Sequence, residues 1–67
     1  MFPIFNKIFD NQQTGWDFLK ANGISYRYAS VIKSYKRLYN PQIYMLKIEA
    51  IKRGISFSDK DFLWREE

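Results

Sequence analysis

The side chains best suited to chemistry in this sequence lie close together, in residues 25–39. The segment carries hydroxyl, guanidinium and ammonium groups and contains no aspartate or glutamate. The two N–H groups of a guanidinium match the two hydrogen-bond acceptors on a guanine edge. Ammonium groups pair with the phosphates of DNA of any sequence. A helix that faces phosphates excludes carboxylates, whereas an ordinary solvated helix usually carries both charges. The segment therefore predicts a surface for nucleic acid, with a merely solvated helix face as the alternative.

A helical wheel divides this segment into two faces. The apolar face, which we expect to pack on the core, consists of Tyr28, Ala29, Ile32, Tyr35 and Tyr39. The opposite face is polar and basic, and Arg27 is its best candidate for a guanine edge. The predicted base contacts are Tyr26, Arg27, Ser30 and Ser34. The predicted phosphate contacts are Lys33, Lys36 and Arg37, together with Thr14 and Gly15 through the amides that open the preceding helix.

A short helix and a tight turn must position this segment. Thr14 is expected to cap the short helix, which spans residues 14–21. Gly23 then tolerates the positive φ that a tight turn needs, and Ile24 is expected to pack under both helices. The next helix begins at Ser25 and runs to about residue 36. This order of cap, helix, glycine turn and second helix predicts a helix-turn-helix.

Three further helices complete the expected fold. One spans residues 3–10, a loop of residues 11–13 follows it, and the longest helix spans residues 40–53. Ser58 is expected to cap a short last helix. No segment sustains the alternation of a β-strand. We therefore predict an all-α fold, a single domain over residues 1–67 built as a compact bundle of about five short helices.

Composition limits the classes of function. The 67 residues carry a net charge of +4 and a pI of about 9.5, which favours an anionic partner. The chain has no cysteine and no histidine, and neither a nucleophile–base pair nor a phosphate-binding loop is recognisable. We therefore expect no enzymatic activity, metal, cofactor or small-molecule substrate. No apolar run approaches the roughly 18 residues of a membrane span, and no secretory signal is recognisable, so we expect a cytoplasmic protein without a membrane partner.

Several boundary residues stand at a distinctive spacing: Thr14, then Phe18-Leu19, then Gly23-Ile24-Ser25, with Asn40-Pro41 and Gly54-Ile55-Ser56 downstream. Over residues 14–63 this pattern resembles the lambda-repressor-like (Cro/Xre-type) helix-turn-helix family of phage and bacterial regulators. The resemblance implies a small transcriptional regulator of phage or mobile-element type. Such a protein would bind double-stranded DNA as a homodimer and read the major groove with helix 25–37.

A second hypothesis keeps this scaffold and changes the partner. Family members usually carry Ala where Leu19 stands, an apolar residue where Asn22 stands and Gln where Gly15 stands. A divergent member could bind a repressor protein, as an antirepressor does. The predicted protein interface consists of Tyr44, Met45, Ile48, Ile51 and Trp64. Two alternatives are the packing of these fourth-helix side chains against the first helix, and the anchoring of the apolar residues 2–9 on a membrane.

Overall fold

The computed structural model describes residues 1–66, and all regular structure in this range is helical. Four α-helices and one short 3-10 helix follow one another along the chain. They are α1 (Pro3–Phe9), α2 (Gln12–Ala21), α3 (Tyr26–Tyr35), α4 (Asn40–Lys52) and η1 (Asp59–Phe62). An isolated antiparallel bridge joins Arg37 to Leu63. The predicted all-α fold is therefore confirmed, and the last of the expected helices is a single 3-10 turn.

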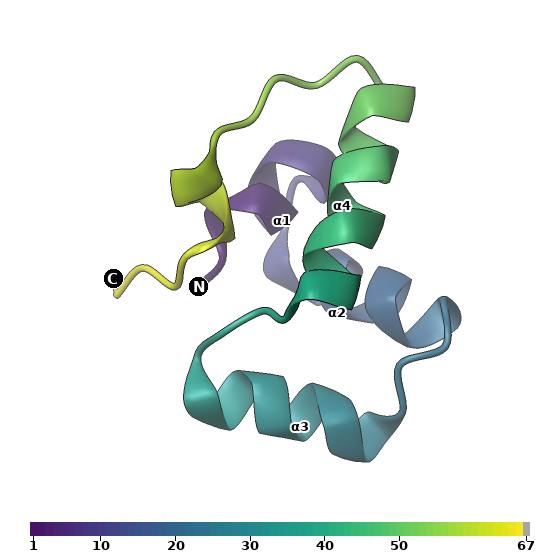
Figure 1. Ribbon diagram of the computed structural model, residues 1–67, viewed down its shortest axis with the longest axis vertical. Helices are drawn as coiled ribbons and strands as arrows, with labels where there is room; N and C mark the ends of the chain where they lie inside the picture. The colour runs from purple at the N-terminus through teal and green to yellow at the C-terminus, as the bar shows by residue number, and fades with distance from the viewer. Residues whose placement is uncertain (67) are drawn as a thin grey trace.

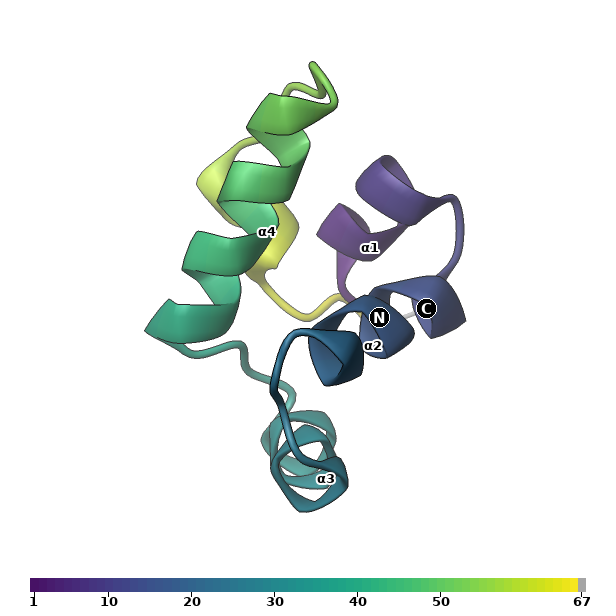
Figure 2. The same cartoon turned by 90° about the vertical axis from the view of Figure 1, so that its right-hand side faces the viewer.

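The helix α3 lies at one end of the molecule, away from α1 and the upper turns of α4 (Figure 1). A view turned by 90° shows α3 end-on beneath α2 and crosswise to α4 (Figure 2). The helices α1 and α2 make the most extensive pairwise packing, and α3 packs mainly on α2. The molecule is thus a packed core of α1, α2, α4 and η1 that displays α3 at its edge.

The helix α1 and the residue before it form the centre of the hydrophobic core. Its buried residues are Phe2, Ile4, Phe5, Ile8 and Phe9. The Phe2 ring makes edge-to-face contacts with Phe5, Trp16 and Trp64, with ring centroids 5.5, 5.9 and 5.0 Å apart. Edge-to-face aromatic pairs contribute about 0.5–1.5 kcal/mol each beyond their burial. The suggestion that residues 2–9 anchor on a membrane is therefore wrong, because these side chains are used inside the protein.

The helix α2 begins three residues earlier than the predicted cap at Thr14 requires. Asn11 is its cap, and the Asn11 Oδ1 atom accepts a hydrogen bond from the amide of Thr14 at 2.7 Å. The side chain of Gln12 exchanges two hydrogen bonds with the backbone of Phe2, at 2.8 and 3.0 Å. The predicted loop at 11–13 and the predicted cap at Thr14 were both wrong. Asn and Thr are both good caps, and here the bonds from Gln12 to α1 favour the earlier start.

The turn between α2 and α3 has the predicted construction. Gly23 adopts a φ of +101°, and Ile24 is buried beneath the two helices. The amide of Ile24 donates to the carbonyl of Leu19 at 3.2 Å. Ser25 caps α3, because its Oγ atom accepts from the amide of Tyr28 at 3.1 Å. The predicted positive φ of Gly23, the burial of Ile24 and the Ser25 cap are confirmed.

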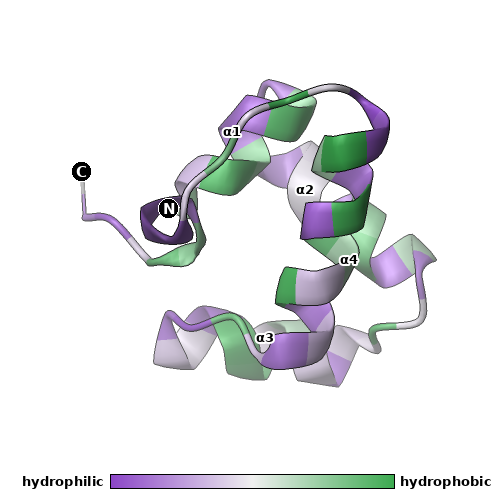
Figure 3. Cartoon of the chain, turned by 45° about the horizontal axis from the view of Figure 1, so that its top comes forward, coloured by the Kyte–Doolittle hydropathy of each residue, from purple (hydrophilic) through white to green (hydrophobic). Residues whose placement is uncertain are grey.

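The helix α4 begins at Asn40 and has Tyr39, not Asn40, at its cap position. The Gln42 Oε1 atom reaches back to accept from the amide of Tyr39 at 3.1 Å, and Gln42 is buried. Gly54 follows the helix with a φ of +69°, as expected of a glycine after a helix end. Hydrophobic residues recur along α4 between hydrophilic ones (Figure 3). Leu46 and Ala50 enter the core, and Ile43 packs against it.

Gly15 lies where α1 and α2 approach most closely. A Cβ atom built on Gly15 would stand 2.3 Å from Cγ of Phe5, whose ring is fully buried. Because this ring is enclosed on all sides, it cannot move away without disturbing the core. We therefore expect Gly15→Ala to lower the free energy of unfolding by about 1–3 kcal/mol, despite the better helix propensity of alanine. Urea unfolding followed by circular dichroism measures the change.

The neighbouring exposed position supplies the control for this prediction. Thr14→Ala should change the stability by less than about 0.5 kcal/mol, because the Thr14 side chain is exposed and is not the helix cap. Equal stability of Gly15→Ala and wild type would contradict the close approach.

An ion pair ties η1 to α1. The Lys7 Nζ atom lies 2.7 Å from Oδ2 of Asp61, and the amide of Ser58 donates to the same oxygen at 2.9 Å. Asp61 is buried, whereas the side chain of Lys7 is 46% exposed. The hydrogen bond from Lys7 holds the pKa of Asp61 below its usual value, and burial opposes this effect only in part.

This ion pair predicts an acid-dependent stability. Asp61→Asn should lower the free energy of unfolding by about 1–2 kcal/mol at neutral pH, because charge-assisted hydrogen bonds are lost. Since the pKa of Asp61 is lower in the folded chain than the roughly 3.9 of an unfolded chain, its contribution is complete above about pH 5. It is lost as the pH falls through the folded-state pKa. Unfolding measured from pH 7 to pH 3 should therefore show the stability gap between wild type and Asp61→Asn narrowing toward the acid end.

Asp59→Asn is the matched control, because Asp59 is an exposed carboxylate of the same 3-10 helix and has no ion pair within residues 1–66. A gap between wild type and Asp61→Asn that stays constant down to pH 3 would rule out the proposed linkage.

Candidate nucleic-acid interface

The helix α3 gives very little of its surface to the core. Ala29 and Ile32 are its only buried residues, and the flanking Ile24 and Leu38 fasten its two ends. The predicted apolar face was wrong in part. Tyr35 is 71% exposed and Tyr28 is also exposed, because the core contact is one narrow strip. Most of the circumference of α3 therefore faces solvent.

All four residues predicted to contact bases are exposed on α3. Arg27, Ser30 and Ser34 lie opposite the buried strip, and Tyr26 lies beside them with 78% of its surface exposed. The Ser30 hydroxyl donates to the carbonyl of Tyr26 at 3.2 Å, which leaves its oxygen free to accept. These residues form a ridge along one helix, about the width that a DNA major groove admits.

Two lysines, Lys20 and Lys33, line the same cleft between α2 and α3. The cleft has a volume of about 50 Å³ and is lined by Trp16, Lys20, Tyr26, Ala29, Ser30 and Lys33. The Nζ atom of Lys20 lies 5.3 Å from the ring centre of Tyr26, and that of Lys33 lies 5.3 Å from that of Trp16. Both ammonium groups therefore flank the polar ridge on the α2 side. Such aromatic contacts favour a cation without removing its charge.

Lys20 was not among the residues predicted from the sequence to contact DNA. It lies in the last turn of α2, three residues before the turn glycine Gly23. A residue at that position must project near the start of the following helix whenever the turn is tight. The spacing of Lys20 before the turn glycine was therefore the signal in the sequence that could have indicated Lys20 as a contact residue.

The other predicted phosphate contacts differ in their surroundings. The Nζ atom of Lys36 lies 2.7 Å from Oε1 of Glu66 and holds the pKa of that carboxyl below its usual range. The charge of Lys36 is therefore partly compensated. Arg37 stacks over Tyr39, with its guanidinium carbon 5.8 Å from the ring centre, and forms no ion pair within residues 1–66.

Phosphate contacts through the amides of Thr14 and Gly15 were predicted on the basis of a wrong helix start. The amide of Thr14 is occupied by the side chain of Asn11, and Gly15 is buried against Phe5. In the observed helix, the first two amides belong to Gln12 and Gln13. The prediction for Thr14 and Gly15 is therefore withdrawn.

Charge is unevenly distributed along the chain. Residues 18–48 contain no aspartate or glutamate and carry six of the eleven basic residues. These six are Lys20, Arg27, Lys33, Lys36, Arg37 and Lys47. Of them, Lys36 alone has an ion pair within the described residues. A concentration of uncompensated cations of this kind attracts polyanions over distances of about a Debye length, ~10 Å at moderate salt.

The residues predicted for a protein interface divide into two groups. Tyr44, Ile48 and Ile51 are exposed on the outer side of α4, opposite its buried residues. Met45, on the same helix, is partly buried against the core. Trp64 does not join them, because its ring packs edge-on against Phe2. The exposed apolar stripe of α4 is therefore formed by Tyr44, Ile48 and Ile51.

The chain matches no protein-family model, and comparison with curated proteins and with solved structures finds no similar protein. The resemblance to the lambda-repressor-like family therefore stays a prediction. Within residues 1–66, no helix combines the length and the apolar character needed to cross a bilayer.

Proposed function

We propose that this protein binds double-stranded DNA as a small transcriptional regulator, with α2 and α3 acting as a helix-turn-helix. The observation that carries the proposal is the exposed, carboxylate-free ridge of α3, flanked by lysines and attached to the core by one narrow strip. A helix displayed in this way can enter a major groove without moving the rest of the fold.

The residues then divide by role. Arg27 would donate two hydrogen bonds to a guanine edge, while Tyr26, Ser30 and Ser34 would supply hydroxyl contacts. Lys20 and Lys33 on one flank, and Arg37 beyond the end of α3, would contact phosphates on either side of the groove. Phosphate contacts give affinity, whereas contacts to base edges give sequence preference.

The proposal predicts salt-dependent binding to any duplex. The purified protein should bind a random duplex of about 30 base pairs with a micromolar dissociation constant at low salt, measured by fluorescence anisotropy. The logarithm of affinity should fall by about 0.9 per phosphate contact for each tenfold increase in salt. A site selected from random sequences then allows specific and non-specific binding to be compared. Absence of binding at low salt would overturn the proposal.

Two substitutions separate base reading from phosphate binding within this test. Arg27→Ala should weaken the selected site by about 1–3 kcal/mol more than random DNA, whereas Lys33→Ala should weaken both alike. Lys52→Ala is the charge-matched control. Lys52 is the last residue of α4, and the C-terminal end of that helix lies away from α3 (Figure 1). Equal losses on both DNAs for Arg27→Ala would remove Arg27 as a base reader.

A second candidate function is a protein-binding module, and the exposed stripe of α4 favours it. Tyr44, Ile48 and Ile51 present three large apolar side chains to solvent, and Ile51 is 70% exposed. An antirepressor would use such a stripe to bind a repressor. A second copy of this chain would use it to place two α3 helices on a palindromic site.

This candidate predicts a complex that resists salt. Ile48→Asp and Tyr44→Ala should each weaken the complex at least tenfold. The first substitution places a charge in the buried interface, and the second removes an apolar contact from it. Analytical ultracentrifugation measures self-association, and calorimetry measures binding to a purified repressor. Val31→Asp, an exposed apolar position on α3, is the control. Partner binding that survives both α4 substitutions would show that the stripe is not the interface.

A further inference from the structure

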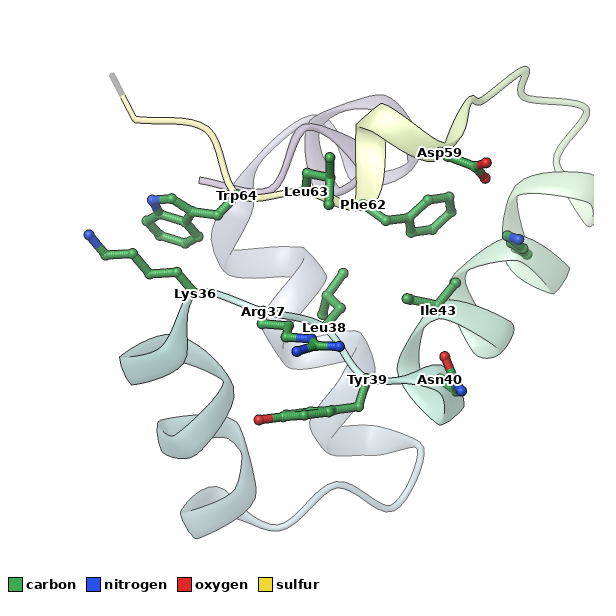
Figure 4. Close-up of a pocket in the computed structure, with 11 residues that line it drawn as sticks. Lys36, Arg37, Leu38, Tyr39, Asn40, Ile43, Asp59, Phe62, Leu63 and Trp64 are labelled. Atoms are coloured by element: carbon green, nitrogen blue, oxygen red, sulfur yellow. The ribbon is translucent and has the colours of Figure 1, made fainter.

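A cavity of about 460 Å³ opens between the connection that follows α3, the helix α4 and the segment around η1 (Figure 4). Its walls come from three parts of the chain: the connection at residues 36–39, the first turns of α4, and the segment 59–64. Ligand sites in proteins commonly measure about 300–1,000 Å³ and combine apolar walls with a few placed polar groups. The cavity has both the size and the mixed lining of such a site.

The apolar walls of this cavity are fixed by the core. Leu38 and Phe62 are buried, and Ile43 and Trp64 pack partly against the core. The ring of Phe62 also makes an edge-to-face contact with Phe57, with centroids 5.7 Å apart. Flat rings at the edge of a packed core offer a surface on which another flat ring can stack.

Two cations face this cavity without a carboxylate partner in residues 1–66. The guanidinium of Arg37 lies beside the connection, over the ring of Tyr39 (Figure 4). Lys47 extends from α4 and places its Nζ atom 5.7 Å from the ring centre of Phe62. Asp59 is the one carboxylate that lines the cavity, and it is drawn at the rim with its oxygens directed away from Arg37 (Figure 4). The interior therefore favours an anion.

The backbone holds Arg37 in place before any ligand arrives. Its amide donates to the carbonyl of Ile32 at 3.3 Å, and it pairs with Leu63 in the antiparallel bridge. The left-handed conformation of Lys36, with a φ of +54°, turns the chain into this bridge. Because the backbone at Arg37 is already ordered, the binding of a ligand costs less conformational entropy there.

We infer that this cavity binds a small organic anion that carries a flat apolar ring. The anionic group contacts Arg37 and Lys47, and the ring stacks against the partly buried Trp64, beside the wall that Phe62 forms. This inference does not rest on the DNA-binding proposal, because the walls and the cations of the cavity belong to the folded chain alone. It adds a small-molecule ligand to a chain for which no small-molecule substrate was expected.

The test titrates the intact protein with 1-naphthyl phosphate and follows the two tryptophan indole N–H signals by NMR. Trp64 lines the cavity and Trp16 does not, so the signal of Trp64 should shift and saturate with a dissociation constant below about 1 mM. 1-Naphthol, which lacks the anion, and inorganic phosphate, which lacks the ring, should each bind at least about tenfold more weakly. Phosphate binding as tight as that of the whole probe would overturn the two-part ligand.

Substitutions assign the binding to the cavity. Arg37→Gln and Lys47→Gln should each weaken binding about tenfold through the loss of a charge-assisted contact, and Asp59→Asn should tighten it. Lys60→Gln is the matched control, since Lys60 is an exposed lysine of η1 that does not line the cavity. Circular dichroism checks that each variant is folded. Unchanged affinity of both Arg37→Gln and Lys47→Gln would overturn the inference. So would the absence of any shift of the Trp64 signal at a probe concentration ten times the expected limit of about 1 mM.

Discussion

The close approach of α1 to α2 at Gly15 is the constraint on which the other contacts depend. The absence of a side chain at Gly15 lets the Phe5 ring lie directly on the α2 backbone. That position brings Phe2 into contact with both tryptophans, so residues far apart in the chain meet on one ring. Burial of each such ring stabilises the fold by about 1.5–3 kcal/mol. A chain of only 67 residues has few other sources of stability.

The position of α3 follows from this arrangement. Because α1 already fills the core beneath α2, only the narrow strip of Ala29 and Ile32 is needed to hold α3. Gly23 and Ile24 fix the direction in which α3 leaves α2, and Leu38 fixes its other end. A helix held in this way exposes its polar side chains on a rigid support, which recognition of a groove requires. The exposure of α3 is therefore a consequence of how the core is built.

The sequence was sufficient for the features that depend on local chemistry. Glycine turns, serine caps and apolar spacing predicted the boundaries of α3, the burial of Ile24 and the exposure of the α4 stripe. The start of α2 was missed because Asn11 and Thr14 are both good caps, and the choice depends on the bonds between Gln12 and the backbone of Phe2, just before α1. The exposure of Tyr35 was missed because a wheel counts tyrosine as apolar without showing how narrow the core contact is.

The cavity beside α3 was beyond any argument from local pattern. It requires Leu63 to pair with Arg37, and these two residues are separated by η1 and the whole of α4. No periodicity of either segment predicts that pairing, since a single bridge needs only two residues in extended backbone. The signal available in the sequence was compositional: Tyr39, Phe62 and Trp64 are aromatic residues that each lie within two positions of a basic one.

Arg37 connects the two surfaces proposed for this protein. It lies just beyond the end of α3, where a phosphate would be contacted, and it also faces the cavity. Lys36 cannot replace it in full, because Glu66 already compensates the charge of Lys36. An anion in the cavity would therefore neutralise Arg37, which has no carboxylate partner within residues 1–66, and by linkage DNA and the anion would each weaken the binding of the other. One guanidinium shared by two anionic partners is sufficient for that coupling, without any change in the fold.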